Sequence, residues 1–185
     1  MKRITFVLAT LVLTVAAAGQ NAPLGYFQLT DDTHVIWQCT YESDLNAKTV
    51  VHRLKMEGLR LLDSAEGLIA FYCDGLHINP EDFGYSRGVT PMFVTGNDLA
   101  FRGFIQLKEG RYRVTLDRIS CINNITTAGG VFVKGNIESF EANALDGREF
   151  THTFRKIPAR IYNMAFYRIF LLMDPEAATY MGDDW

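Results

Sequence analysis

The side chains best suited to chemistry in this sequence are two arginines on one predicted strand. Arg111 and Arg113 alternate with apolar residues, so both would project from the same face of that strand. Two guanidinium groups placed in this way could hold a carboxylate or a phosphate through bidentate hydrogen bonds. The interpretation that we favour is a structural pair, whose stems cover apolar surface and whose charged ends meet Asp117 or Glu109.

Histidine chemistry has one candidate. His77 lies close in sequence to Asp74 and Glu81, and a carboxylate beside the ring could support general acid–base catalysis. None of the four histidines has a partner at a metal-ligand spacing, and the sequence contains no glycine-rich phosphate loop, nucleophile elbow or zincin motif. The sequence therefore predicts no catalytic, cofactor-binding or metal site. It leaves His77, Arg111 and Arg113 as candidate contacts to a ligand or partner.

The first residues have the order of a signal peptide. Lys2 and Arg3 form a positive start, an apolar run from Ile4 to Val15 follows, and small residues end it. The run is shorter than the ~20 residues that a membrane-spanning helix requires. We expect a bacterial export signal that is cleaved after Ala18 or Gly19. The mature protein would be periplasmic or secreted, without a stable membrane span.

Three cysteines remain in the mature chain: Cys39, Cys73 and Cys121. An oxidising compartment would permit one disulfide and leave one thiol, with three possible pairings. The alternative that we favour is that all three are small buried apolar residues, because a domain built on disulfides would contain more cysteines. Cys39, the first of them, is too far from the cleavage site to carry a lipid anchor.

The composition is that of one globular domain. With 48% hydrophobic and 21% charged residues, the chain has enough apolar material to bury a core. Without Lys2 and Arg3, 16 basic residues remain against 21 acidic ones, a net charge of −5. Phosphate binding needs clustered Lys and Arg, so this balance argues against nucleic acid. We predict a signal peptide over 1–19, a leader over 20–33, one α+β domain over 34–173 and an acidic tail over 174–185.

Residue patterns predict the elements of the first half. His34–Tyr41 is rich in β-branched and aromatic residues and is expected to form a strand. A cap at Ser43 or Asp44 would begin an amphipathic helix that Gly58 ends. Further along, the apolar stretches Leu59–Leu62 and Leu68–Cys73 are predicted to form a hairpin across Asp63–Gly67. The glycine- and proline-rich segment Asp74–Pro91 is then expected to be the longest and most mobile loop.

The second half begins with the clearest hairpin. Leu99–Leu107 and Arg111–Ile119 are joined by Lys108-Glu109-Gly110, and the second arm alternates strictly between apolar and polar residues. A further hairpin is predicted between Val131–Phe140 and Glu149–Phe154, across Asp146-Gly147.

The last predicted element is a helix that opens at Pro158, a residue that the first turn of a helix tolerates. Its apolar residues from Tyr162 to Met173 cover more than one side, so we expect this helix to be buried. Asp174-Pro175 would end it.

The stretch Gly103–Leu116 resembles the signature hairpin of a family of exported bacterial proteins. The resemblance rests on a Lys-any-Gly turn, here Lys108 and Gly110, followed by Arg111-Tyr112-Arg113. That family is a domain of unknown function with a TATA-binding-protein-like fold. The resemblance extends over Val35–Ile119 and implies a curved antiparallel sheet with a helix packed on it, in the order β-α-β-β-β. It implies no activity and no DNA binding, because fold does not imply function.

Two segments depart from the pattern of this family. Asp74–Pro91 is longer than the usual link, and Val131–Phe154 has no counterpart in the resemblance.

Together these features favour an exported cell-envelope domain with a non-catalytic binding or structural role. Its partner would be an envelope protein or ligand, bound by the sheet face or by the Asp74–Pro91 loop. One alternative is a carrier that holds a small apolar ligand between the sheet and the helix Tyr162–Met173, which needs a cavity of ~300 Å³ or more. A more remote alternative is an envelope hydrolase built around His77.

Overall fold

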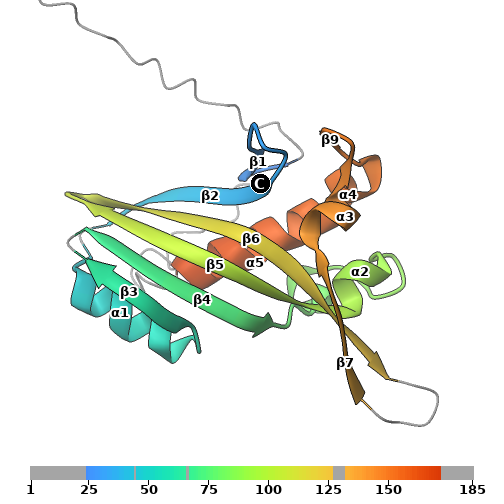
Figure 1. Ribbon diagram of the computed structural model, residues 1–185, viewed down its shortest axis with the longest axis horizontal. Coiled ribbons are helices and arrows are strands. Elements are labelled where there is room, and N and C mark those ends of the chain that lie inside the picture. Colours follow the sequence, from blue (N-terminus) through green and yellow to red (C-terminus); the bar gives the residue numbers. More distant parts are fainter. Residues whose placement is uncertain (1–23, 44, 66, 127–131, 172–185) are drawn as a thin grey trace, which may run out of the picture.

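An antiparallel sheet forms the centre of the molecule in this computed structural model (Figure 1). The structure describes residues 24–171, apart from 44, 66 and 127–131. The predicted signal peptide and acidic tail lie outside these residues. The strand order is β1-β2-β6-β5-β4-β3. β7 pairs with the second half of β6, beyond the residues of β6 that pair with β2. The strands are β1 (Phe27–Leu29), β2 (Val35–Glu42), β3 (Arg60–Ala65), β4 (Leu68–Leu76), β5 (Asn97–Lys108), β6 (Arg111–Thr126) and β7 (Phe132–Ser139).

Alternation along the strands decides which face of the sheet is buried. In β2, Val35, Trp37, Cys39 and Tyr41 are buried, and the residues between them are half-buried or exposed. This two-residue period is typical of a sheet with one packed face and one solvated face. β1 lies within the predicted leader 20–33, so the sheet begins before the predicted domain start.

The β5–β6 hairpin is confirmed. Lys108 pairs with Arg111, and the two-residue connection ends at Gly110, whose φ of +71° favours glycine. Both strands are longer than predicted, and β6 changes its outer partner from β2 in its first half to β7 in its second.

Helix α1 (Ala47–Met56) follows β2 as predicted, but its cap is different. The side chain of Asn46 accepts a hydrogen bond from the Thr49 amide at 3.0 Å, so the predicted cap at Ser43 or Asp44 is wrong. The predicted stop at Gly58 is confirmed. Gly58 has a φ of +74°, and its amide donates to the carbonyl of Lys55, which satisfies an unpaired group of the last turn.

The β3–β4 hairpin has a shorter loop than predicted. Ala65 already pairs with Leu68, so Asp63–Ala65 belong to the strand. β3 is the edge of the sheet and all its residues are exposed, and an exposed edge accepts polar side chains that a central strand would not.

The segment Asp74–Pro91 contains more regular structure than predicted. β4 runs to Leu76, and the 3-10 helix η1 (Pro80–Phe83) and the short helix α2 (Met92–Thr95) follow. The side chains of Ile78 and Thr90 are buried, which fastens both ends of this connection to the domain.

The predicted hairpin between Val131–Phe140 and Glu149–Phe154 is wrong in its arms. β7 pairs with β6, because β6 extends far enough to offer it an edge. Helix α3 (Phe140–Ala144) follows, and Asp146-Gly147 does turn the chain, but between the two-residue strands β8 (Leu145–Asp146) and β9 (Glu149–Phe150). Helix α4 (His152–Lys156) comes next.

Helix α5 (Pro158–Leu171) begins at Pro158 as predicted and lies across the buried face of the sheet (Figure 1). Its aromatic rings contact rings of the strands. The ring centroid of Phe166 lies 5.5 Å from that of Trp37 and 5.6 Å from that of Phe101. The centroid of Phe170 lies 5.6 Å from that of Phe71. The predicted α+β architecture, an antiparallel sheet with helices packed on it, is confirmed.

Candidate functional site

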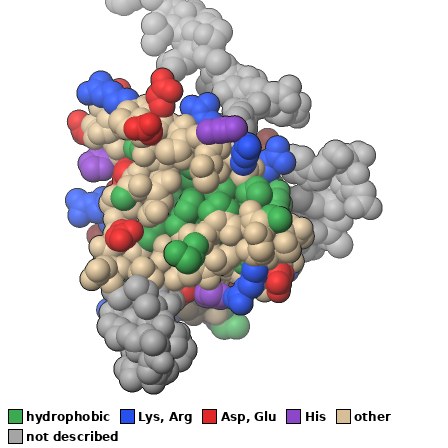
Figure 2. All heavy atoms as spheres, turned by 90° about the vertical axis from the view of Figure 1, so that its right-hand side faces the viewer, with side chains coloured by type: hydrophobic (Ala, Val, Ile, Leu, Met, Phe, Trp, Pro, Cys, Tyr) green, Lys and Arg blue, Asp and Glu red, His purple; other side chains and the backbone are tan. Residues whose placement is uncertain are grey.

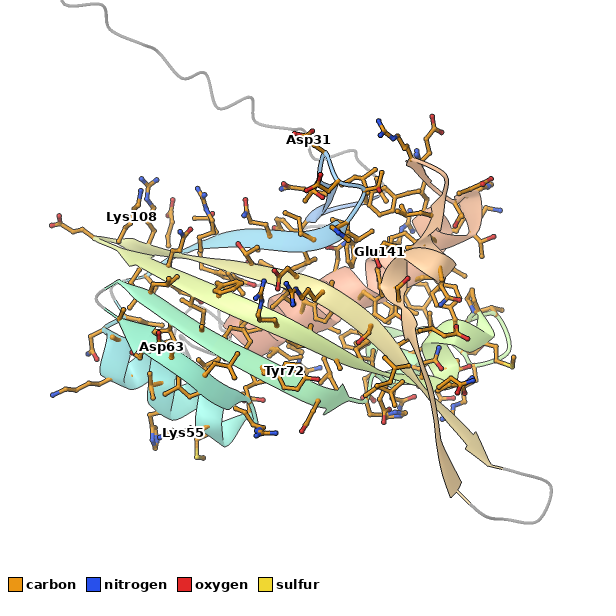
Figure 3. The ribbon with its side chains drawn as sticks, in the orientation of Figure 1. Asp31, Lys55, Asp63, Tyr72, Lys108 and Glu141 are labelled. Carbon is orange, nitrogen blue, oxygen red and sulfur yellow. The ribbon has the colours of Figure 1, made fainter. Side chains whose placement is uncertain are left out.

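The sheet presents one face that neither α1 nor α5 covers. We call this the open face. Figure 3 shows Tyr72 of β4 and Asp63 of β3 among its side chains. Directly opposite residues of antiparallel strands point to the same side. Tyr72 pairs with Arg102, and Arg102 pairs with Asp117, so these three residues form a row across the centre of the open face.

Arg102 and Asp117 are held together rigidly. The Arg102 Nε donates to Asp117 Oδ1 at 2.9 Å, and Nη2 donates to the other carboxylate oxygen. This hydrogen bonding raises the pKa of the Arg102 guanidinium. The guanidinium also lies over the ring of Phe104, with Cζ 4.8 Å from the ring centroid. A bidentate pair fixed on an aromatic ring is preorganised, since its rotamers are set before any ligand arrives.

The neighbouring row adds a second polar pair. Phe104 pairs with Thr115, and Thr115 pairs with Gln38 of β2. The Gln38 amide nitrogen donates to the Thr115 hydroxyl at 3.0 Å. We call the six residues of these two rows the central cluster: Gln38, Tyr72, Arg102, Phe104, Thr115 and Asp117.

A β-bulge adjoins the central cluster. Two residues of β6, Arg118 and Ile119, lie opposite one residue of β5. Arg118 has a φ of +49°, a left-handed conformation that costs a non-glycine residue about 1 kcal/mol. Bulges of this kind occur next to functional sites, where they redirect a side chain or end a pairing. Here the bulge lies where β6 leaves β2.

His77 does not meet the carboxylates that the sequence suggested. Its Nδ1 lies 2.8 Å from Asp98 Oδ1, across the start of β5, and not against Asp74 or Glu81. The carboxylate beside the ring is therefore not one of its neighbours in sequence, because β4 and β5 bring Asp98 opposite His77 in space. Both side chains are partly exposed. Asp74 instead forms an exposed ion pair with Arg60 at 3.5 Å.

Arg111 and Arg113 lie on the open face near the β5–β6 turn, and both are exposed. Asp117 pairs with Arg102, and Glu109 makes no ion pair with either arginine, so the predicted structural pairing of these arginines is wrong. Within the described residues neither forms an ion pair. Arg111 lies opposite Glu42 on one side and Lys108 on the other.

The three cysteines are free and buried, so the favoured interpretation of them is confirmed. Burial raises the pKa of the Cys39 thiol to about 11 and that of Cys121 to about 12. A thiol is nucleophilic as the thiolate, and these thiols stay protonated at neutral pH. In the described part of the chain, no group of three or more His, Cys, Asp or Glu residues is placed to hold a metal ion.

A second surface feature is apolar. Figure 2 shows hydrophobic side chains gathered at the end of the molecule that carries α2, with charged side chains around them. Val89 is 61% exposed and Met92 is 83% exposed on that side of the chain. Such a patch is typical of a contact surface, but it offers no group for chemistry.

The fold resembles two solved structures. A DUF4468 family protein from Bacteroides ovatus has a TM-score of 0.50 at 13% sequence identity, and the match covers 82% of this chain and 92% of the other. A TBP-like protein from Parabacteroides distasonis has a TM-score of 0.51 at 9% identity, over 83% and 97% of the two chains. No protein-family model matches the sequence, and no curated protein matches it. The chain therefore has the TATA-binding-protein-like fold that the resemblance implied.

Sequence reasoning did not single out Tyr72, Arg102 or Phe104. One signal was present, because Arg102 and Phe104 alternate with apolar residues along the predicted strand and must share its solvated face. Their partners come from β4 and β6, and only the register of those strands brings the cluster together.

Proposed function

We propose that this chain is an exported, non-catalytic binding module that recognises its partner with the open face of its sheet. One observation carries the proposal: α1 and α5 bury one face, whereas the other presents an aromatic and polar cluster that is fixed by its own contacts. The Arg102–Asp117 pair, held over Phe104, is a rigid recognition element. Rigid elements bind with a smaller loss of side-chain entropy than mobile ones.

Export is supported by the amino-terminal sequence, where a positive start, a short apolar run and small residues follow in the order that signal peptidase requires. Among residues 24–171, outside the stated gaps, no helix is long and apolar enough to cross a membrane.

A carrier of a small apolar ligand is supported less well. The interface between α5 and the sheet is filled by rings in contact, among them Trp37, Phe71 and Phe166. The packing is so tight at Gly103 that a Cβ there would meet the Phe71 ring at 2.0 Å. A hydrolase is also supported less well, since the His77 ring hydrogen-bonds to Asp98 and, in the described structure, to no serine, threonine or cysteine.

Site-specific photo-crosslinking tests the binding surface. A benzophenone side chain would replace Gln106, which is exposed on the open face, or Lys48, which is exposed on α1. Both proteins would be expressed with the full chain in a Gram-negative host, and the mature mass would report cleavage after Ala18 or Gly19. We expect specific crosslinks from position 106 and none from 48. Crosslinks from 48 alone, or an uncleaved cytoplasmic chain, would contradict the proposal.

A further inference from the structure

The central cluster carries no net charge, and this limits the ligands that it can recognise. Arg102 and Asp117 neutralise each other through two hydrogen bonds, and Arg60 and Asp74 pair at the margin. An anionic or cationic ligand would have to compete with a preformed bidentate pair to reach either charge, which costs the ligand most of its electrostatic gain. The cluster therefore favours a ligand without charge.

The same side chains keep hydrogen-bonding groups that their internal contacts do not use. Arg102 donates to Asp117 through Nε and Nη2, so the two hydrogens on its Nη1 remain available to a ligand. Gln38 donates to Thr115, so its carbonyl oxygen and the Thr115 hydroxyl hydrogen remain available. The Tyr72 hydroxyl makes no hydrogen bond within the described residues. Donors and acceptors are thus interspersed over a small area, which suits a ligand with several adjacent hydroxyl groups.

Two aromatic rings complete the arrangement. Phe104 pairs with Ala70, and Tyr72 is the next residue of β4 on the same face, so the rings are diagonal neighbours. The Cα atoms of diagonal neighbours are about 7–8 Å apart, a spacing over which two aromatic side chains can contact one ligand. The small side chain of Ala70 leaves room beside Phe104. Rings on a sheet face bind flat apolar surfaces, such as the C–H face of a sugar ring.

Other occupants fit this face less well. Nucleic acid needs clustered, unpaired cations, whereas Arg102, the cation of the central cluster, is paired with Asp117. Arg111 and Arg113, which form no ion pair in the described part of the chain, lie outside the cluster, nearer the β5–β6 turn. A peptide strand adds to the edge of a sheet, whereas the central cluster lies on inner strands.

We infer that the central cluster binds a neutral glycan. The ring of Tyr72 and the face of Phe104 that Arg102 does not cover would lie against sugar C–H faces, and the paired polar groups would bind its hydroxyls. This inference rests on the proposed function, for which it names the ligand class. The affinity does not depend on salt, because no charge is exchanged between ligand and protein.

Affinity gel electrophoresis of the mature protein tests this inference. The gels would contain a neutral polysaccharide (a glucan, a mannan, a galactan or a xylan) or the acidic polygalacturonate, each at low and high salt. We expect retardation by at least one neutral polysaccharide, unchanged by salt. Tyr72→Ala and Phe104→Ala should each weaken binding about tenfold, which corresponds to ~1.4 kcal/mol.

Two variants serve as controls, and a third tests Arg102. Phe104→Tyr keeps a ring, and Met92→Ala removes an exposed apolar side chain of α2, outside the central cluster, so both should bind nearly as the wild type does. Arg102→Lys should weaken binding, because an ammonium cannot replace a bidentate guanidinium. Circular dichroism of each variant would verify that it is folded.

Three results would overturn the inference. They are retardation by polygalacturonate alone with loss at high salt, no retardation by any polysaccharide, and equal retardation of the wild type and both ring variants. If any one of these results appeared while position 106 still gave specific crosslinks, the glycan assignment would fail and the binding function would stand. If position 106 gave no crosslinks either, both would fail.

Discussion

Gly103 provides the sharpest test of how this fold is packed. It lies in β5 on the face that α5 covers, directly opposite Phe71 of β4. A Cβ at this position would lie 2.0, 2.4 and 2.5 Å from three atoms of the Phe71 ring. Phe71 is fully buried and its ring contacts Phe170 at 5.6 Å, so it has no free space into which to move. We therefore expect Gly103→Ala to destabilise the domain.

The magnitude follows from two opposing effects. Local propensity alone favours the substitution, because glycine within a strand is less stable than alanine by about 0.5–1 kcal/mol. Overpacking of a filled core costs about 1–3 kcal/mol, and three contacts below 3 Å place this site at the upper end. The net loss in free energy of unfolding is about 2 kcal/mol. The structure thus reverses the sign that the sequence alone predicts.

Urea unfolding of the purified protein, followed by tryptophan fluorescence, measures this loss. Gly75→Ala in β4 is the matched control, since a Cβ there would meet nothing within 4 Å, and it should be neutral or stabilise the domain by up to about 1 kcal/mol. In a Phe71→Leu background the clash is removed, so Gly103→Ala should become neutral or stabilising, with a coupling energy of about 2 kcal/mol. Wild-type stability of Gly103→Ala, or an equal loss in both backgrounds, would refute the reasoning.

Two further predictions concern buried polar groups. Asn163→Ala removes hydrogen bonds of 2.8–3.0 Å, including the one that the fully buried Trp37 indole donates, and should lower the free energy of unfolding by about 2–4 kcal/mol in a thermal melt. A melting temperature equal to that of the wild type would contradict the structural assignment of the Asn163 side chain.

The raised pKa of Cys39, about 11 against an ordinary 9.0, makes the folded state hold the thiol proton more tightly than the unfolded state. Its contribution to stability is complete below pH 9 and disappears as the pH rises towards 11, so the urea midpoint should fall between pH 8 and pH 10, and fall less in Cys39→Ala. Equal pH dependence in the two proteins would argue against burial as its cause.

Local patterns predicted much of the fold because they act over a few residues. The alternation around Tyr112 and the turn ending at Gly110 specify the β5–β6 hairpin from sequence alone. The same holds for α5, whose start at Pro158 follows from the φ that proline fixes. Prediction failed for β7, because its pairing with β6 depends on where a distant edge lies, and no local pattern encodes that edge.

The candidate site shows the same division. The sequence analysis identified His77, Arg111 and Arg113 as side chains capable of contacts, and it did not single out Arg102 or Phe104, although the alternation along their strand puts both on one face. It could not supply their partners. Asp117 reaches Arg102, and Asp98 reaches His77, through strand register over 15 and 21 residues of chain.

The sequence by itself determined the class of this protein, an α+β chain with small buried cysteines, and its first residues predict an export signal. Those properties depend on composition and on the order of neighbouring residues, and both can be taken directly from the sequence. Only the tertiary structure decided which face is open and which side chains meet on it. Strand pairing is non-local, and a shift by one residue would turn Tyr72 and Arg102 into the core.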